Sequence, residues 1–173
     1  TYTDDEVGAL YVFIKPTGGW SGGITHTAKL TATNGGDFDE LGRVVAIEGD
    51  TVVAGTSCGA QEAYVFVKPA EGWHNITDTA RLIPNDPLGI GQCYGTDVDI
   101  AGDMVVVGAI RANVFPYDDA YGAAYVFTKP ATGWSGTVTH TAKLYPDTPA
   151  SGDRRFGLAV AIEDETIAVS EPD

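Results

Sequence analysis

The feature that most constrains the fold of this chain is an internal repeat. The segment GWSGGITHTAKL at residues 19–30 returns as GWSGTVTHTAKL at residues 133–144, and a shorter variant, GWHNITDTARL, stands at residues 72–82. A repeat of this kind implies that each copy builds the same supersecondary unit and that neighbouring units stack to bury their apolar faces. The fold of the whole chain therefore follows from the fold of one copy.

Each copy extends beyond this segment and contains four short apolar runs. The tyrosines Tyr11, Tyr64 and Tyr125 align the first parts, GALYVFIKPTGGW, QEAYVFVKPAEGW and GAAYVFTKPATGW. After a variable loop follow LGRVVAIEGDTVVAG from residue 41, YGTDVDIAGDMVVVG from 94 and FGLAVAIEDETIAVS from 156. Glycine turns and a Lys-Pro pair separate the runs, each of which has the length of a strand.

Four consecutive antiparallel strands per unit are typical of a propeller blade. The abundance of glycine and β-branched residues and the absence of a helical period agree with this interpretation. The sequence therefore predicts an all-β fold of three four-stranded antiparallel propeller-type blades, with inner strands near 41–48, 94–101 and 156–163.

The repeated unit, FG-x-x-VAI-x-GD-TVVVGA followed by GAAYVF, resembles the FG-GAP repeat, the blade of integrin α-chain propellers and of many bacterial surface proteins. Phe156-Gly157 keeps the FG pair, whereas the other copies have Leu41-Gly42 and Tyr94-Gly95. The resemblance implies that the inner strand of each blade begins at this pair. It also implies that the YVF segment is the third strand and the TAKL segment the outermost.

The repeat is out of phase with the chain, which predicts a split blade. Blades are expected at about 41–89 and 94–150, while 156–173 supplies only an inner half and 1–35 only an outer half. Exposed strand edges invite pairing, so the half-blade at 156–173 is expected to be completed by 1–35, most readily from a neighbouring copy. Such a head-to-tail contact yields a ring or a filament. The alternative is that the chain is a piece of a longer array.

Residues suited to chemistry are few. The tryptophans Trp20, Trp73 and Trp134 recur at one position, where packing between blades is a better interpretation than sugar stacking. His26 and His140 are equivalent but lack partners at fixed offsets for metal binding or base catalysis. No nucleophile elbow or phosphate-binding loop is present. We therefore expect no enzymatic activity, although an enzyme using the central face of a propeller is a third hypothesis.

The formal net charge of −14 disfavours nucleic acid and anionic lipid as partners, and no run of residues is apolar enough to insert into a membrane. No cofactor is expected. The resemblance raises calcium, which FG-GAP blades often hold between their first two strands, but here that connection shrinks to EGD, AGD or EDE. Weak calcium binding is left only to the acidic loops at 3–6, 37–40 and 116–122.

Two cysteines, Cys58 and Cys93, are the only ones in the chain. The blade order that the resemblance implies puts them in two connections on the same face of adjacent blades, so we expect a disulfide between them, with two unrelated thiols as the alternative. Asn75-Ile76-Thr77 is an acceptor motif for N-glycosylation. These features suggest an extracellular or cell-surface protein.

Two functions from different classes fit these observations. The first is a structural or adhesive protein whose copies assemble head-to-tail, through the split blade, into a ring or filament. The second is a ligand-binding module, with a carbohydrate or protein ligand, cut from a larger closed propeller. Electron microscopy distinguishes them, because filaments and discrete rings look different.

Overall fold

A computed structural model describes residues 7–36, 39–56, 58, 60–85, 92–113, 121–147 and 155–172. Within these residues the chain forms strands and no helix, so the all-β prediction is confirmed. The strands are β1 (Leu10–Val12), β2 (Ala28–Thr31), β3 (Val44–Glu48), β4 (Thr51–Gly55), β5 (Ala63–Val67), β6 (Ile76–Thr77), β7 (Ala80–Ile83), β8 (Tyr94–Ala101), β9 (Met104–Ala109), β10 (Ala123–Thr128), β11 (Gly136–Thr139), β12 (Ala142–Leu144), β13 (Val160–Glu163) and β14 (Thr166–Val169).

Two sheets in the middle of the chain have the four antiparallel strands that the repeat predicts. One has the order β7-β5-β4-β3, with β11 added outside β7, and the other has the order β12-β10-β9-β8. The two sheets share one register, because Tyr64 lies opposite Arg81 and Tyr125 lies opposite Lys143. We call these sheets blade 1 (β3, β4, β5, β7) and blade 2 (β8, β9, β10, β12).

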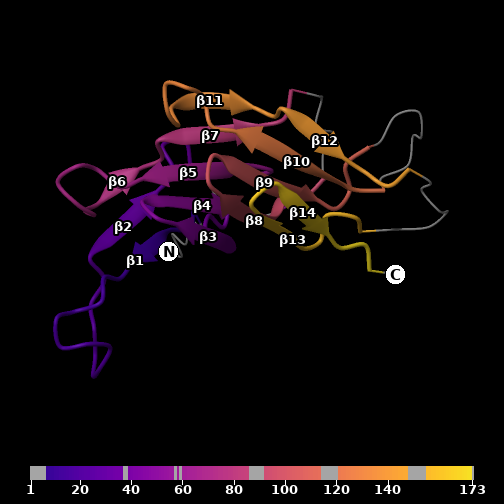
Figure 1. Ribbon diagram of the computed structural model, residues 1–173. Coiled ribbons are helices and arrows are strands. Elements are labelled where there is room, and N and C mark those ends of the chain that lie inside the picture. Colours follow the sequence, from indigo (N-terminus) through magenta and orange to yellow (C-terminus); the bar gives the residue numbers. More distant parts are fainter. Residues whose placement is uncertain are drawn as a thin grey trace, which may run out of the picture.

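Two smaller sheets flank the blades (Figure 1). The N-terminal half-blade contains β1 and β2, which correspond to the third and fourth strands of a blade, and Tyr11 lies opposite Lys29 in the common register. The C-terminal half-blade is the β13–β14 hairpin, which corresponds to the first and second strands. Among the described residues these halves do not pair with each other, so the chain by itself holds two blades and two halves rather than three closed blades.

The expectation of four antiparallel strands per unit is incomplete, because two short strands are parallel to their neighbours. The connection between the third and fourth strands of blade 2 forms β11, which pairs in parallel with β7 of blade 1. The same connection in blade 1 forms β6, which pairs in parallel with β2. The pattern within one repeat unit does not predict these pairs, because they bridge two units.

The core lies between successive sheets, which stack in a row. One cluster joins the N-terminal half-blade to blade 1, a second joins the two blades, and a third joins blade 2 to the β13–β14 hairpin. Each blade thus contributes one face to the cluster before it and the other face to the cluster after it. This arrangement explains why both faces of the central strands are apolar.

Glycine at the second position of the FG pair allows adjacent sheets to approach closely. Gly95 and Gly157 have φ values of +90° and +91°, which L side chains rarely adopt. A Cβ atom on Gly95 would lie 2.6 Å from the carbonyl oxygen of Glu62 in the preceding blade, and one on Gly157 would lie 2.4 Å from that of Ala123. The first residue of the pair varies between copies, but the glycine cannot.

Candidate assembly interface

Within the described residues, β1 and β14 lie at opposite ends of the row, and each pairs on one side only, although its equivalents in the complete blades pair on both sides. In each blade the third strand pairs with both the second and the fourth, as β5 does with β4 and β7. The equivalent strand β1 pairs with β2 alone, and β14 pairs with β13 alone. Compared with a complete blade, β1 lacks the neighbour that occupies the second-strand position, and β14 lacks the neighbour that occupies the third-strand position. Each edge is therefore of the type that the other edge lacks as a neighbour.

The aromatic side chains of β1 and the residue after it are exposed where their repeat equivalents are buried. Tyr64 and Tyr125 are fully buried, whereas Tyr11 is 51% exposed. Phe13 is likewise 49% exposed, in contrast with the buried Phe66 and Phe127. The buried equivalents face the preceding sheet, so the exposure of Tyr11 and Phe13 shows that no described sheet lies before the N-terminal half-blade.

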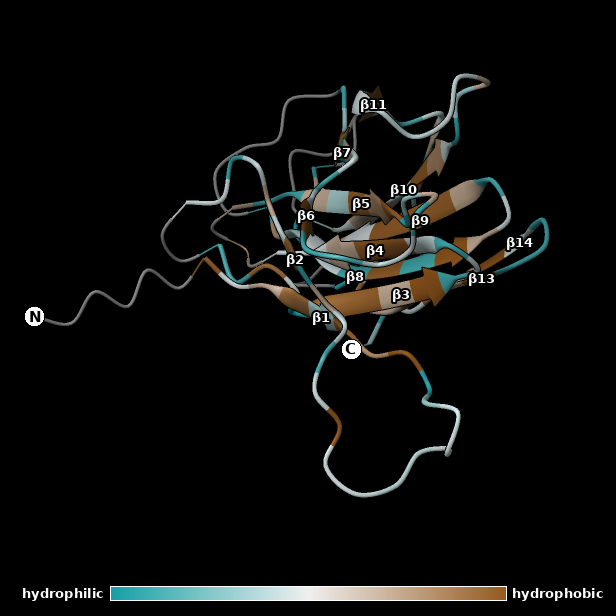
Figure 2. Cartoon of the chain, turned by 90° about the vertical axis from the view of Figure 1, so that its left-hand side faces the viewer, coloured by the Kyte–Doolittle hydropathy of each residue, from teal (hydrophilic) through white to brown (hydrophobic). Residues whose placement is uncertain are grey.

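Side chains on the inner strand of blade 1 are likewise exposed where their repeat equivalents are buried. Val45 and Ile47 on β3 are 58% and 65% exposed. The equivalent side chains on β8 and β13, which are Val98, Ile100, Val160 and Ile162, are all at most 8% exposed. A groove between β1 and β3–β4 is lined by residues that include Tyr11, Phe13, Val45 and Ile47. Figure 2 shows β1 and β3 side by side, both largely hydrophobic.

The opposite end of the row also carries an open apolar face. A groove between β12 and β14 is lined by residues that include Leu144, Tyr145, Ile167 and Val169, and Tyr145 is exposed. In a completed third blade, a third strand would lie here beside β14 and would cover these side chains. Each end of the row of sheets thus carries an open apolar face.

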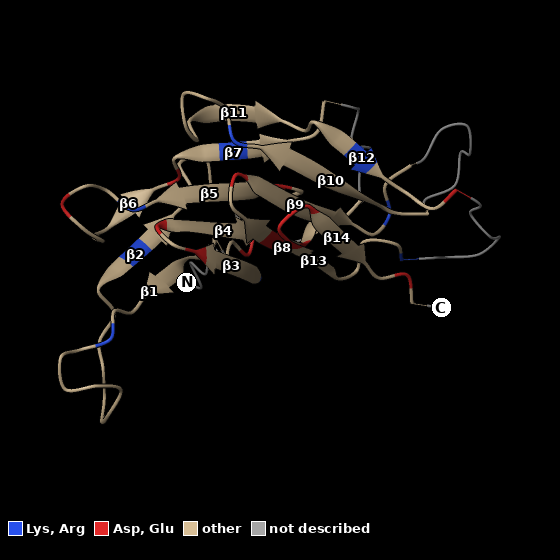
Figure 3. Ribbon diagram, viewed as in Figure 1, with Lys and Arg blue, Asp and Glu red and all other residues tan. Residues whose placement is uncertain are grey.

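Charged residues recur at the hairpin turns of the blades (Figure 3). Lys68 pairs with Asp50 in blade 1, and Lys129 pairs with Asp103 at 2.8 Å in blade 2. Each pair links the end of the third strand to the turn between the first and second strands. In the half-blades the equivalent positions hold Lys15 at one end of the row and Glu165 at the other.

The buried tyrosines are structural hydrogen-bond donors. Burial raises the pKa of Tyr64 to about 12, with Asp39 and Asp78 adding to the effect. The Tyr64 hydroxyl donates to Glu62, which also pairs with Arg81. Burial raises the pKa of Tyr94 well above its ordinary value, with Tyr125 contributing, and the Tyr94 hydroxyl donates to the Leu82 carbonyl at 2.9 Å. Both groups stay neutral across the physiological range.

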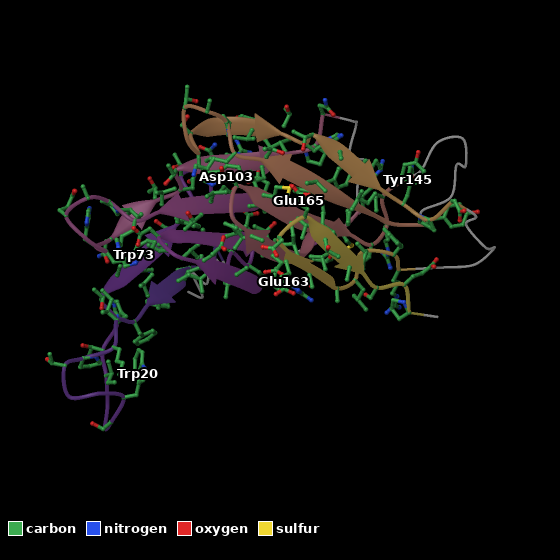
Figure 4. The ribbon with its side chains drawn as sticks, in the orientation of Figure 1. Trp20, Trp73, Asp103, Tyr145, Glu163 and Glu165 are labelled. Atoms are coloured by element: carbon green, nitrogen blue, oxygen red, sulfur yellow. A yellow bond between two sulfur atoms is a disulfide. The ribbon has the colours of Figure 1, made fainter. Side chains whose placement is uncertain are left out.

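The repeated tryptophans have three different environments. Trp134 is 5% exposed in the core cluster between the blades, and Trp73 packs half-buried against the cluster before blade 1. Trp20 is 60% exposed, on a loop that extends away from the body of the molecule (Figure 4). A position that fills a core in one copy is therefore open to solvent in another.

The predicted disulfide between Cys58 and Cys93 is present, with 3.9 Å between the Cα atoms. It joins the loop after β4 to the loop before β8 and so fastens blade 1 to blade 2. A bond that closes a loop of 35 residues stabilises by about 3–4 kcal/mol in the chain-entropy model. The predicted acceptor Asn75 is exposed, and its Oδ1 atom accepts a hydrogen bond from the Lys29 amide at 2.8 Å.

The acidic loops proposed for calcium lie largely outside the described residues, which exclude residues 3–6, 37–38 and 116–120. Of the rest, Asp39 accepts a bond from the Gly36 amide and Glu40 pairs with Arg43 at 2.7 Å. Across the part of the chain that the structure describes, no three His, Cys, Asp or Glu side chains are placed to hold a metal ion. The same residues contain no helix with the length and hydropathy of a membrane span.

Sequence reasoning used Tyr11 to align the repeats and did not single out the exposed residues on β3. The signal for Val45 and Ile47 was in the repeat itself, because their equivalents must be covered by a preceding sheet. A pairing of Lys15 with Glu165 could have been predicted in the same way, because their repeat equivalents form ion pairs.

Comparison with protein families gives a match to a repeat family. A family model described as the FG-GAP repeat matches residues 24–66 and 76–127, as two repeats that together cover more than half of the chain. A comparison with curated proteins finds no match.

Proposed function

The chain belongs to the FG-GAP repeat family, and from this premise we propose that it is a non-enzymatic structural repeat protein that assembles head-to-tail with copies of itself. The contact is the completion of a split blade: β13–β14 of one copy receives β1–β2 of the next. The observation that carries the proposal is the pair of open edges on β1 and β14, which are third-strand and second-strand edges of the same repeat.

The two complete blades predict the register of this contact. In blade 1 Val67 lies opposite Thr51, and in blade 2 Thr128 lies opposite Met104. The equivalent pair across the junction is Ile14 of one copy with Thr166 of the other. The pairing adds main-chain hydrogen bonds to an edge that is otherwise open.

Burial of apolar side chains supports the same contact. The N-terminal half-blade of the incoming copy would place Tyr11 and Phe13 against blade 2 of its neighbour. The β13–β14 hairpin would in turn cover Val45 and Ile47 of the incoming copy. Each of these side chains is about half exposed in the single chain, so its burial contributes about 1 kcal/mol.

Charge complementarity favours this direction of assembly. The ion pairs Asp50–Lys68 and Asp103–Lys129 are internal to each blade. In the completed blade Lys15 of one copy would meet Glu165 of the other. An exposed pair of this kind contributes little affinity, but it disfavours wrong registers.

The repeat family and the disulfide suggest an extracellular domain, so the proposed assembly forms outside the cell or at its surface. An adhesive role, with a carbohydrate or protein ligand on the outer surface, belongs to the same proposal. No cofactor is part of it.

The test uses variants with one added cysteine, which is the only free thiol because the two native cysteines are bonded to each other. Ile14→Cys and Thr166→Cys chains are mixed under mild oxidation and examined on non-reducing gels. We expect covalent dimers that need both variants in the mixture, because opposite residues on paired strands lie within disulfide range. The matched control pairs Ile14→Cys with Ala168→Cys, which is two residues out of register.

Absence of the dimer at concentrations where chains associate would overturn the proposal. Electron microscopy then separates the two functions that the sequence left open. Filaments or rings built from many chains support assembly, whereas discrete single-chain particles, with a native mass larger than this chain, favour a module of a larger propeller.

A further inference from the structure

The connection between the third and fourth strands reaches back to the preceding sheet in both complete blades. In blade 2 this connection contains β11, and Val138 on β11 lies opposite Leu82 on β7. In blade 1 it contains β6, and Ile76 on β6 lies opposite Leu30 on β2. Val138 and Ile76 are repeat equivalents, as are Leu82 and Leu30. The same register thus occurs at two independent junctions.

A side-chain hydrogen bond is also reproduced at the two junctions. Asp78, just after β6, accepts a bond from the Thr33 amide. His140, just after β11, has its Nδ1 atom 3.2 Å from the Asn85 amide, which donates to it. Asp78 and His140 are equivalent positions, and so are Thr33 and Asn85. The connection therefore has a defined strand register and a defined terminal contact.

The N-terminal half-blade has the same connection but no preceding sheet among the described residues. We call residues 13–27 the arm. The arm extends away from the body, whereas β11 lies along β7 (Figure 1). The sequence from Gly19 to Leu30 differs from residues 133–144 at only two positions. His26 contacts the Tyr11 ring at 4.9 Å between centroids, as His140 contacts the Tyr125 ring at 5.1 Å.

The strand that the arm would pair with is also present. By the repeat, the outer strand of the preceding blade is β12, which is an edge strand of its sheet in the part of the chain that the structure describes. Tyr145, directly after β12, is 51% exposed, and Figure 4 shows it on the opposite side of the molecule from Trp20. In β7, the equivalent of β12, this edge is covered by β11.

We infer that the arm adds a parallel strand to the outer edge of β12 in a second copy of the chain. The register places Ile24 opposite Leu144 and Thr25 opposite Tyr145. His26 accepts a hydrogen bond from the Asp147 amide, as His140 does from the Asn85 amide. Trp20 is buried between the two copies, as Trp134 is buried between blades 1 and 2. The inference rests on the proposed head-to-tail assembly, but it uses a different strand edge from the β1–β14 contact.

This second contact pairs the arm with the outermost strand of the preceding sheet, as β6 pairs with β2 and β11 pairs with β7. Pairing of β1 with β14 alone joins two chains through one short strand. The arm binds the neighbouring sheet on its outer side, so the two chains are held at the middle and at the rim of the completed blade. A two-point attachment restricts the orientation of successive copies more than a single strand does.

The closing experiment uses the same cross-linking format with a different residue pair. Thr25→Cys and Tyr145→Cys change exposed positions, so neither should disturb the folded chain. We expect covalent dimers from their mixture. The matched control, Ser21→Cys with Tyr145→Cys, keeps both cysteines on the same two segments but out of register, and should yield at least tenfold less dimer.

A second measurement follows the arm without a cross-link. Trp20→Ala should weaken association at least tenfold, because the indole loses its contact with the neighbouring copy, while Ser21→Ala should leave association unchanged. Hydrogen exchange should show protection of the amides at residues 22–25 on assembly.

The outcomes separate this inference from the proposed function. If the Ile14 and Thr166 variants cross-link but the Thr25 and Tyr145 variants give no more dimer than their control, the arm does not bind β12, and head-to-tail assembly stands. If neither pair cross-links, both proposals fail. Equal association of the Trp20→Ala variant and the unaltered chain would also overturn the role of the arm.

Discussion

At the scale of single residues, the glycine of the FG pair sets the distance between sheets. Changing Gly95 to Ala introduces a Cβ atom that would lie 2.6 Å from the Glu62 carbonyl, at a φ of +90°. We expect a loss of about 2–4 kcal/mol in the free energy of unfolding, from conformational strain together with steric overlap. Denaturant unfolding measures this loss.

The control for this variant is Gly133→Ala. Gly133 has a φ of +88°, but no atom lies within 4 Å of the position that a Cβ would occupy there. Only the conformational cost, about 1 kcal/mol, should therefore remain. Equal losses in the two variants would show that close approach of the sheets is not the reason for the glycine.

The buried Tyr64 hydroxyl makes stability depend on pH at the alkaline end. Its pKa in the folded chain is about 12, above the ordinary value of 10.0, so the folded state disfavours the phenolate. The resulting stability is fully present below pH 10 and is lost as the pH rises from 10 towards 12. The Tyr64→Phe variant should lose less stability over this interval, as measured by denaturant midpoints at each pH. Parallel curves for the two chains would contradict the prediction.

At the scale of elements, two carboxylates attach the β13–β14 hairpin to blade 2. Asp97 and Asp99 on β8 accept hydrogen bonds from the Val160 and Ile162 amides on β13, both at 2.8 Å. A hydrogen bond to a charged group is worth about 1.5–3 kcal/mol. We expect the double variant Asp97→Ala/Asp99→Ala to loosen the hairpin, with faster hydrogen exchange confined to β13 and β14. Unchanged exchange there would show that apolar packing alone holds the hairpin.

At the scale of the whole molecule, the row of sheets is held together by its cores but carries an open face at each end. Val45→Lys/Ile47→Lys changes two side chains that are exposed in the single chain, so folding should be little affected. In the proposed assembly these lysines would be buried without partners, so association should fall at least a hundredfold. Sedimentation over a range of concentrations measures the effect, and Thr137→Lys, an exposed change remote from both open ends, is the control. Normal association of the double variant would place the interface elsewhere.

Much of the fold was predictable from the sequence because the same strand pattern recurs in each copy of the repeat, so that each copy supports the assignment of the others. The strand runs, the glycine turns and the inner strands near 41–48, 94–101 and 156–163 follow from apolar periodicity and turn residues, which act within a unit. The disulfide needed one further step, the blade order that the family implies. The parallel strands β6 and β11 were not predictable in this way, because Ile76 and Val138 pair with residues of another unit.

The sequence by itself determined the unit: four short strands, the residues that turn between them, and the phase of the repeat that leaves half a blade at each end. These follow from backbone preferences and from the alternation of apolar side chains, which are local properties. Only the tertiary structure decided which face of each unit is covered. Tyr11 and Tyr64 occupy the same repeat position, and so do Trp20 and Trp134, yet one of each pair is exposed and the other buried. The physical reason is that burial depends on the neighbouring sheet, and among the described residues no sheet lies before the one formed by β1 and β2.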